Sequence, residues 1–127
     1  MVAQRTRHAA IAANLANSET LLNAAGEYEP YKRREVMFAP GDPTSPTRDG
    51  RAMGVHVERI HVNEEALRAR YDPTSPFADE RGIVMVPDIS PAIETINSMQ
   101  AVRAYEANVQ AAEVTKQMLA QALRLLA

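Results

Sequence analysis

The chain has 127 residues, a formal net charge of −2 at pH 7 and no cysteine. It can therefore form neither disulfides nor thiolate metal sites, and its mixed charges give no electrostatic reason to bind nucleic acid or an anionic membrane. No apolar run approaches the ~20 residues of a membrane span, and residues 1–8 lack the apolar segment of a cleavable signal peptide.

Residues 1–24 are predicted to be mainly helical. The segment is rich in alanine, contains no glycine or proline, and places Ile11 and Leu15 four residues apart on one helical face. Asn17 or Ser18 is a plausible end of this helix, because both favour chain ends over helix interiors. The helix is too poor in large apolar side chains to be stable alone, so we expect it to pack on another helix.

Residues 25–90 have a different character and are predicted to form a small β-rich module packed against the helices. All five glycines of the chain and seven of its eight prolines fall between residues 26 and 90. Short β-rich runs are predicted at residues 31–38, 55–62, 67–71 and 83–86. Val55 and Val57 alternate, whereas Ile60 and Val62 continue one residue out of phase, which predicts a β-bulge or bend.

Two related linkers interrupt the module. Residues 42–46 and 72–76 both read Asp-Pro-Thr-Ser-Pro, and the two prolines together with the side-chain acceptors of Asp and Ser predict a stiff turn in each copy. Residues 40–53 contain almost no large apolar side chain and are expected to form an exposed loop.

Residues 91–127 are predicted to form one long helix. Ser90 can cap it, Pro91 suits its first position, and Glu94 places a carboxylate in its first turn. From Val102 onward the apolar positions repeat every 3.5 residues, a spacing typical of coiled coils. The stripe consists of Val102, Tyr105, Val109, Ala112, Leu119, Leu123 and Leu126, with Lys116 at its one polar position.

A single helix cannot hide such a stripe from water. A second apolar row through Met118 and Leu125 lies beside the first, so the helix is expected to have more than one neighbour. The predicted fold class is therefore α+β, with the N- and C-terminal helices packed as a coiled-coil-like core. The chain is interpreted as part of an assembly.

Candidates for catalysis or metal binding are weak. His56, Glu58 and His61 could supply three ligands to a zinc ion, but they more often face solvent on a strand, and no fourth ligand is evident. The basic run 32–34 fits a solvated strand edge or a salt bridge to another subunit better than a phosphate site. No glycine-rich phosphate loop or nucleophile motif is present in the sequence, so we expect no enzymatic activity, no cofactor and no metal.

Three stretches resemble one family. Residues 11–20, which include Asn14-Leu15-Ala16-Asn17, are similar to the signature shared by bacterial flagellar rod and hook proteins. Tyr71-Asp72-Pro73, followed by residues 76–87, resembles the segment that leads into the last helix of the proximal rod protein of the FlgC type. Residues 103–109, Arg-Ala-Tyr-Glu-Ala-Asn-Val, are similar to the motif of that helix.

The resemblance implies a structural subunit of the flagellar basal-body rod. Such a subunit would be exported by the flagellar type III apparatus without signal cleavage. It would assemble in the periplasm with other rod proteins and with copies of itself into the shaft that transmits torque. The expected assembly interface combines the stripe named above with Ile11, Asn14, Leu15 and Asn17 of the first helix.

Two further expectations follow from the sequence. A soluble helical oligomeric adaptor or chaperone-like protein is the alternative function, because it would use the same helices. The family carries about a dozen residues before the part that resembles residues 3–7, so we expect translation to begin upstream of Met1.

Overall fold

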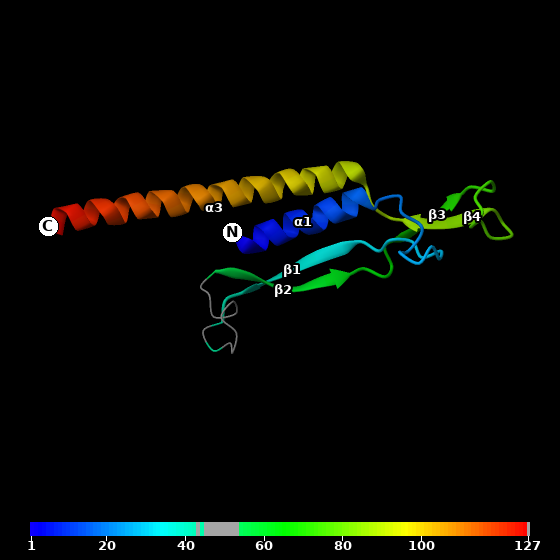
Figure 1. Ribbon diagram of the computed structural model, residues 1–127, viewed down its shortest axis with the longest axis horizontal. Helices are drawn as coiled ribbons and strands as arrows, with labels where there is room; N and C mark the ends of the chain where they lie inside the picture. The colour runs from blue at the N-terminus through cyan, green and yellow to red at the C-terminus, as the bar shows by residue number, and fades with distance from the viewer. Residues whose placement is uncertain (43, 45–53, 127) are drawn as a thin grey trace.

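The computed structural model describes residues 1–42, 44 and 54–126. In chain order the elements are α1 (Val2–Ala16), β1 (Arg34–Pro40), β2 (Val55–Val62), β3 (Leu67–Tyr71), β4 (Ile83–Pro87) and α3 (Pro91–Leu126). Two helices flank a middle of antiparallel strands (Figure 1), which confirms the α+β class. Most of the exposed loop expected at residues 40–53 lies outside the described residues.

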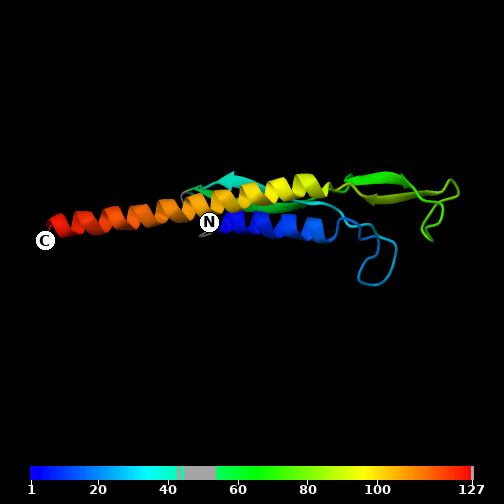
Figure 2. The same ribbon diagram turned by 90° about the horizontal axis from the view of Figure 1, so that it is seen from above.

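The molecule is elongated. The 36-residue α3 is about 54 Å long, whereas the 15-residue α1 is about 22 Å long. The two helices run antiparallel, and α1 lies beside only the first half of α3 (Figures 1 and 2). The chain exposes 9513 Å² of surface, roughly 40% more than a compact monomer of 14.0 kDa would expose.

The first helix ends where its sequence stops favouring helix. Asn17 is the C-terminal cap residue, and its Nδ2 donates a hydrogen bond of 2.9 Å to the carbonyl of Ala13. The same carbonyl also accepts the Asn17 backbone N–H at 3.1 Å, so Asn17 closes the last turn with both its backbone and its side chain. The helix ends at Asn17, one of the two predicted positions, and residues 18–24 do not continue it.

Strands β1 and β2 form an antiparallel two-stranded sheet that packs against α1. Met37 pairs with Arg59, but the next residue, Phe38, pairs with Val57, so Glu58 is an extra residue in β2. The predicted irregularity between Val57 and Ile60 is thus confirmed as a β-bulge.

Strands β3 and β4 form a second, separate two-stranded sheet. It continues beyond the end of the helix pair along the long axis, where β2 and β3 follow each other end to end (Figures 1 and 2). The small β-rich middle is thus divided into two sheets, of which one packs against α1 and the other lies beyond the helix pair. The four-residue connection between β2 and β3 extends the chain onward instead of turning it back.

Small side chains allow the helices to approach closely. Ala3, Ala10 and Ala101 are buried, together with Ile11. A second apolar cluster is formed by Val84, Val86 and Ile89, at and just after β4. Among the described residues, no helix has a stretch that is long and apolar enough to cross a membrane.

Candidate assembly surface

The apolar stripe of α3 becomes more exposed along the helix. Val102 and Tyr105 lie opposite the N-terminal end of α1 and are about 40% exposed. Val109 and Ala112 are partly buried, whereas Leu119 and Leu123 are 62% and 60% exposed. The side chain of Leu126 lies outside the described residues. The stripe therefore begins where α3 packs on α1 and continues along the second half of α3, which has no neighbour within the described chain.

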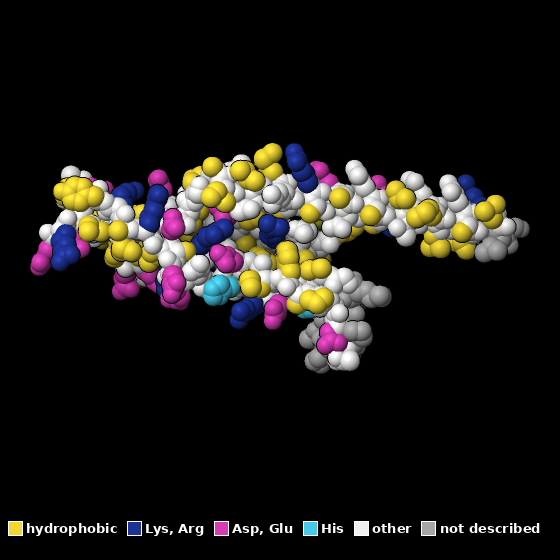
Figure 3. All heavy atoms as spheres, turned by 180° about the vertical axis from the view of Figure 1, so that it is seen from behind, with side chains coloured by type: hydrophobic (Ala, Val, Ile, Leu, Met, Phe, Trp, Pro, Cys, Tyr) yellow, Lys and Arg dark blue, Asp and Glu magenta, His cyan; other side chains and the backbone are white. Residues whose placement is uncertain are grey.

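A groove marks the point where the covered part of the stripe ends. Its volume is about 290 Å³, and it is lined by Gln4, Arg5 and His8 of α1 and by Ala101, Val102 and Tyr105 of α3. Beyond it, apolar side chains follow α3 toward its C-terminal end (Figure 3). The exposed members of the second row include Met118 and Leu125. Lys116, the polar member of the stripe, is exposed.

The four candidate residues of α1 divide into two kinds. Ile11 and Asn14 are buried within the chain, and Asn17 is partly buried as the helix cap. Leu15 is 40% exposed. Leu15 is thus the α1 candidate whose side chain is most available to a neighbour.

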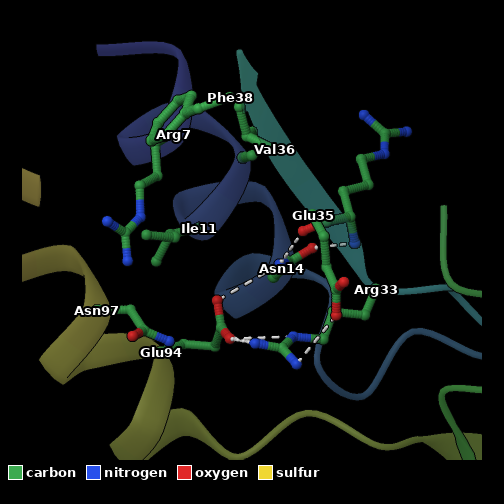
Figure 4. A pocket seen from close by; sticks show the side chains of 11 residues that line it. Arg7, Ile11, Asn14, Arg33, Glu35, Val36, Phe38, Glu94 and Asn97 are labelled. Carbon is green, nitrogen blue, oxygen red and sulfur yellow. Dashed lines mark hydrogen bonds and ion pairs between the residues drawn. The ribbon is translucent and has the colours of Figure 1, made fainter. Parts of the chain in front are cut away.

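Asn14 connects α1 to the start of β1 (Figure 4). Its Oδ1 accepts a hydrogen bond of 2.9 Å from the Arg34 amide, and its Nδ2 donates one of 2.9 Å to the Arg34 carbonyl. Oδ1 also accepts from the Tyr31 hydroxyl, and Nδ2 also donates to Glu94 Oε2 at 3.3 Å. All four hydrogen-bonding positions of the side-chain amide are therefore used.

Glu94 continues this connection into the first turn of α3. Its side chain is 2% exposed, and its Oε1 pairs with Arg33 Nη2 at 2.8 Å and accepts a second bond from Nε at 3.2 Å. A buried carboxylate is tolerated only when it is paired and hydrogen-bonded, and both conditions are met. We call Asn14, Arg33 and Glu94, with Tyr31, the polar junction; it joins α1, the approach to β1 and α3.

The junction also affects Tyr31. Burial raises the pKa of the Tyr31 hydroxyl, the nearby Arg34 guanidinium opposes this rise, and the Glu94 carboxylate adds to it. The hydroxyl is consequently a hydrogen-bond donor to Asn14 Oδ1, at 3.2 Å, throughout the neutral pH range.

Two members of the basic run 32–34 form ion pairs within the chain. Arg33 pairs with Glu94, and Lys32 Nζ pairs with Glu64 Oε2 at 2.8 Å. In the isolated chain these two residues thus already have carboxylate partners, and a salt bridge from them to another subunit stays a prediction. Glu64 and Glu94 lie more than thirty positions from Lys32 and Arg33 in the sequence, so no local pattern predicts these two pairs, whereas Glu35, which also pairs with Arg33 at 3.4 Å, is a near neighbour.

The histidine-containing candidate set is not brought together. His56 and His61 both belong to β2, and the described part of the chain contains no cluster of three histidine or acidic side chains that could hold a metal ion. Sequence reasoning placed Glu94 at a helix N-terminus but missed its burial and its partner. A carboxylate one turn into a helix, with an asparagine on the facing helix, is the signal that could have found the junction.

A stretch of 45 residues near the C-terminal end of the described fold matches a known family. Residues 81–125 match the model for "Flagellar basal body rod FlgEFG protein C-terminal"; these residues comprise β4 and nearly all of α3. An extended chain whose last helix carries an uncovered apolar stripe agrees with that class, the flagellar basal-body rod proteins.

Full-length relatives narrow the class further. The chain is similar to "Flagellar basal-body rod protein FlgC" of Bacillus subtilis strain 168, with 33% identity over 98% of this chain and 90% of the relative. The protein of the same name from Aquifex aeolicus strain VF5 is 36% identical over 93% of this chain and 83% of the relative. That of Buchnera aphidicola from Schizaphis graminum is 32% identical over 98% of this chain and 89% of the relative. The chain belongs to the FlgC family and is a structural subunit of the flagellar basal-body rod.

Proposed function

We propose that the exposed apolar stripe of α3 is the main surface through which this subunit joins the rod. One observation carries the proposal: Leu119 and Leu123 lie on the second half of α3, which no other described part of the chain covers, and each is about 60% exposed. Fully burying a leucine side chain contributes about 1.5–3 kcal/mol, so contact with neighbouring helices supplies a strong driving force for assembly.

The proposed neighbours are other rod proteins and further copies of this chain. Lys116 would set the register of these helix contacts, as polar residues in coiled-coil seams do. The subunit would reach the periplasmic part of the basal body through the flagellar type III export apparatus, without a cleaved signal peptide. Its role would be to transmit torque, and it would have no catalytic activity. The relatives, which are named as rod proteins, support this role.

Leu119→Asp tests the proposal against Gln117→Asp as a matched control. Both residues are exposed on α3, but Gln117 points roughly opposite to the stripe, at 100° per residue. In the assembled rod the carboxylate of Leu119→Asp would be buried in an apolar contact between helices, at a cost of several kcal/mol. We expect this variant to be made at normal levels, to unfold like the parent chain and to be absent from isolated basal bodies, whereas Gln117→Asp is incorporated.

Normal amounts of the Leu119→Asp variant in basal bodies, with motile cells, would show that the stripe is not an interface. A parent chain that is absent from basal bodies but forms a small, stable oligomer in solution would favour the adaptor alternative.

A further inference from the structure

The two small sheets have four outer strand edges; side chains of the same chain occupy the start of the β1 edge and close the β4 edge. In an antiparallel pair, every second residue directs its N–H and C=O away from the partner strand. On β1, Arg34 is such a residue, and the Asn14 amide occupies both of its outward groups. The Asn14 side chain therefore takes the place that a further strand would otherwise have.

The outer edge of β4 is closed in a similar way. The Tyr28 hydroxyl donates to the Met85 carbonyl at 2.8 Å and accepts from the Met85 amide at 3.1 Å. Asp79 occupies both outward groups of Ile83, with distances of 2.8 Å and 3.0 Å. Pro87, the last residue of the strand, has no N–H to offer.

The outer edges of β2 and β3 remain open. The Asn63 amide donates to the Arg33 carbonyl, and the Asp72 amide donates to the Gly82 carbonyl. Because these residues direct their backbone groups toward the partner strand, the residues next to them in each strand, and every second one from there, direct theirs outward. These are Ile60 and Val62 on β2, and Ala69 and Tyr71 on β3. Within the part of the chain that the structure describes, no hydrogen bond satisfies the backbone groups of these four residues, and all four are exposed. Open strand edges are templates for pairing with another chain.

We propose that β2 of one copy pairs with β3 of the next copy, which produces the four-stranded sheet β1-β2-β3′-β4′. This inference rests on the proposed self-assembly and specifies a contact for it. Within one copy the pairing is impossible, because β2 and β3 follow each other end to end (Figures 1 and 2). The outer edges of the combined sheet are β1, which Asn14 occupies at Arg34, and β4, which Tyr28 and Asp79 close. The pairing also replaces two marginal two-stranded sheets by one of four strands.

Charge and symmetry favour this pairing over like-with-like pairing. β3 carries Arg68 and Arg70 and no acidic residue, so pairing two β3 strands would place like charges together. β2 offers Glu58 beside Arg59. Pairing two β2 strands would close a two-fold dimer and leave both β3 edges open, whereas a head-to-tail contact from β2 to β3′ can repeat along an assembly.

Engineered cysteines test the contact directly, because the natural chain has none. The full chain is expressed in flagellated cells with one cysteine at Ile60 or Val62 and a second at Ala69 or Tyr71, so that the four double variants cover alternative registers. After mild oxidation we expect at least one variant to give a ladder of disulfide-linked copies. Met37→Cys combined with Ala69→Cys is the control, because β1 is one further strand away and two strand spacings, about 9.6 Å, exceed disulfide reach.

A backbone variant gives independent evidence. Ala69→Pro removes an outward N–H that the β3–β4 ladder does not use, so the isolated hairpin should keep its stability while incorporation falls about tenfold. Ala69→Thr retains the N–H and should be incorporated normally. The unfolding midpoint of each purified variant shows whether a loss of incorporation comes from misfolding.

The outcomes separate this inference from the proposed function. A ladder in isolated basal bodies supports both. A ladder only in fractions without basal bodies supports the strand pairing and contradicts the rod location. A chain that is present in basal bodies but gives no ladder from any of the four variants, together with normal incorporation of Ala69→Pro, overturns the strand pairing alone. A chain absent from basal bodies that gives no ladder overturns both.

Discussion

At the scale of single residues, Asn14 behaves as a substitute for a neighbouring strand. A side-chain amide has the same donor and acceptor as a peptide group, so it can satisfy the N–H and C=O of one strand residue together. Asn14 does this at Arg34 while it also reaches Glu94 on α3. One buried side chain therefore fixes the positions of α1, β1 and α3 relative to each other.

Asn14→Asp should destabilise the isolated chain by about 3 kcal/mol, measured by urea unfolding. The substitution keeps the size of the side chain but replaces the N–H donor with an oxygen, so that a second carboxylate faces Glu94 and the Arg34 carbonyl. Asn17→Ala is the comparison. It removes a helix-capping bond at a partly buried site and should cost only about 1 kcal/mol. Equal losses for the two variants would contradict the role given to the junction.

The stability of the chain should fall as the pH rises above the ordinary tyrosine pKa of 10.0. Burial, together with Glu94, raises the pKa of Tyr31, so the unfolded chain releases this proton at a lower pH than the folded chain does. The stabilisation is complete below pH 10 and is lost as the pH rises through the folded-state pKa.

Urea unfolding of the parent chain and of Tyr31→Phe between pH 8 and about 11 measures this effect. The pair with Glu64 raises the pKa of Lys32, and it adds a decline of the same sign to both chains. The parent should therefore lose more stability than Tyr31→Phe over this range. If the free energies of unfolding of the two chains fell in parallel with pH, Tyr31 would make no contribution.

At the scale of elements, two glycines in left-handed turns differ in their surroundings. Gly82, just before β4, has φ +73°, and a Cβ there would lie 3.0 Å from Tyr71 Cε2 and 3.1 Å from Pro73 Cβ. Gly26 has a similar φ of +82°, with nothing within 4 Å of the same position. At both positions a residue with a side chain would pay the cost of a left-handed backbone conformation. Only at residue 82 would its Cβ also press against neighbouring atoms.

Gly82→Ala should therefore cost about 2 kcal/mol of folding free energy and Gly26→Ala about 1 kcal/mol. Thermal or urea unfolding of the two purified variants gives the comparison. If Gly26→Ala were the more damaging change, the close packing of the β3–β4 turn would not be the reason that glycine is needed at residue 82.

Local sequence patterns predicted the elements well, but not their long-range pairing. The heptad spacing and the absence of glycine and proline correctly predicted α3, and the phase change between Val57 and Ile60 predicted the bulge. The division into two sheets depends on the direction of a short connection, which alternation does not encode. The Arg33–Glu94 pair joins residues 61 positions apart, so nothing in either neighbourhood reveals the other.

At the scale of the whole molecule, the two halves of α3 differ in how much of the chain packs against them. Packing on α1 and the polar junction stabilise the start of α3, while the residues beyond Val109 extend away from the other elements (Figure 1). Most helical stability in proteins comes from packing and not from intrinsic propensity. The second half of α3 should therefore open more easily in an isolated subunit.

Amide hydrogen exchange on a proven monomer tests this difference. We expect residues 93–105 to be protected and residues 114–125 to exchange much faster, because local opening requires little loss of packing there. Addition of assembly partners should slow exchange in the second segment. Strong, uniform protection of both segments in the monomer would contradict folding that is completed by assembly.

The polar junction also has a mechanical consequence. α1, α3 and β1 all extend roughly along the long axis of the molecule (Figures 1 and 2), and the bonds made by Asn14 and Glu94 connect them sideways. A force that slides one of these elements along another would load these bonds in shear. Bonds loaded in shear share the force and yield together, whereas bonds that are peeled apart fail one after another. The junction would make each subunit stiff against the kind of load that a rotating shaft carries.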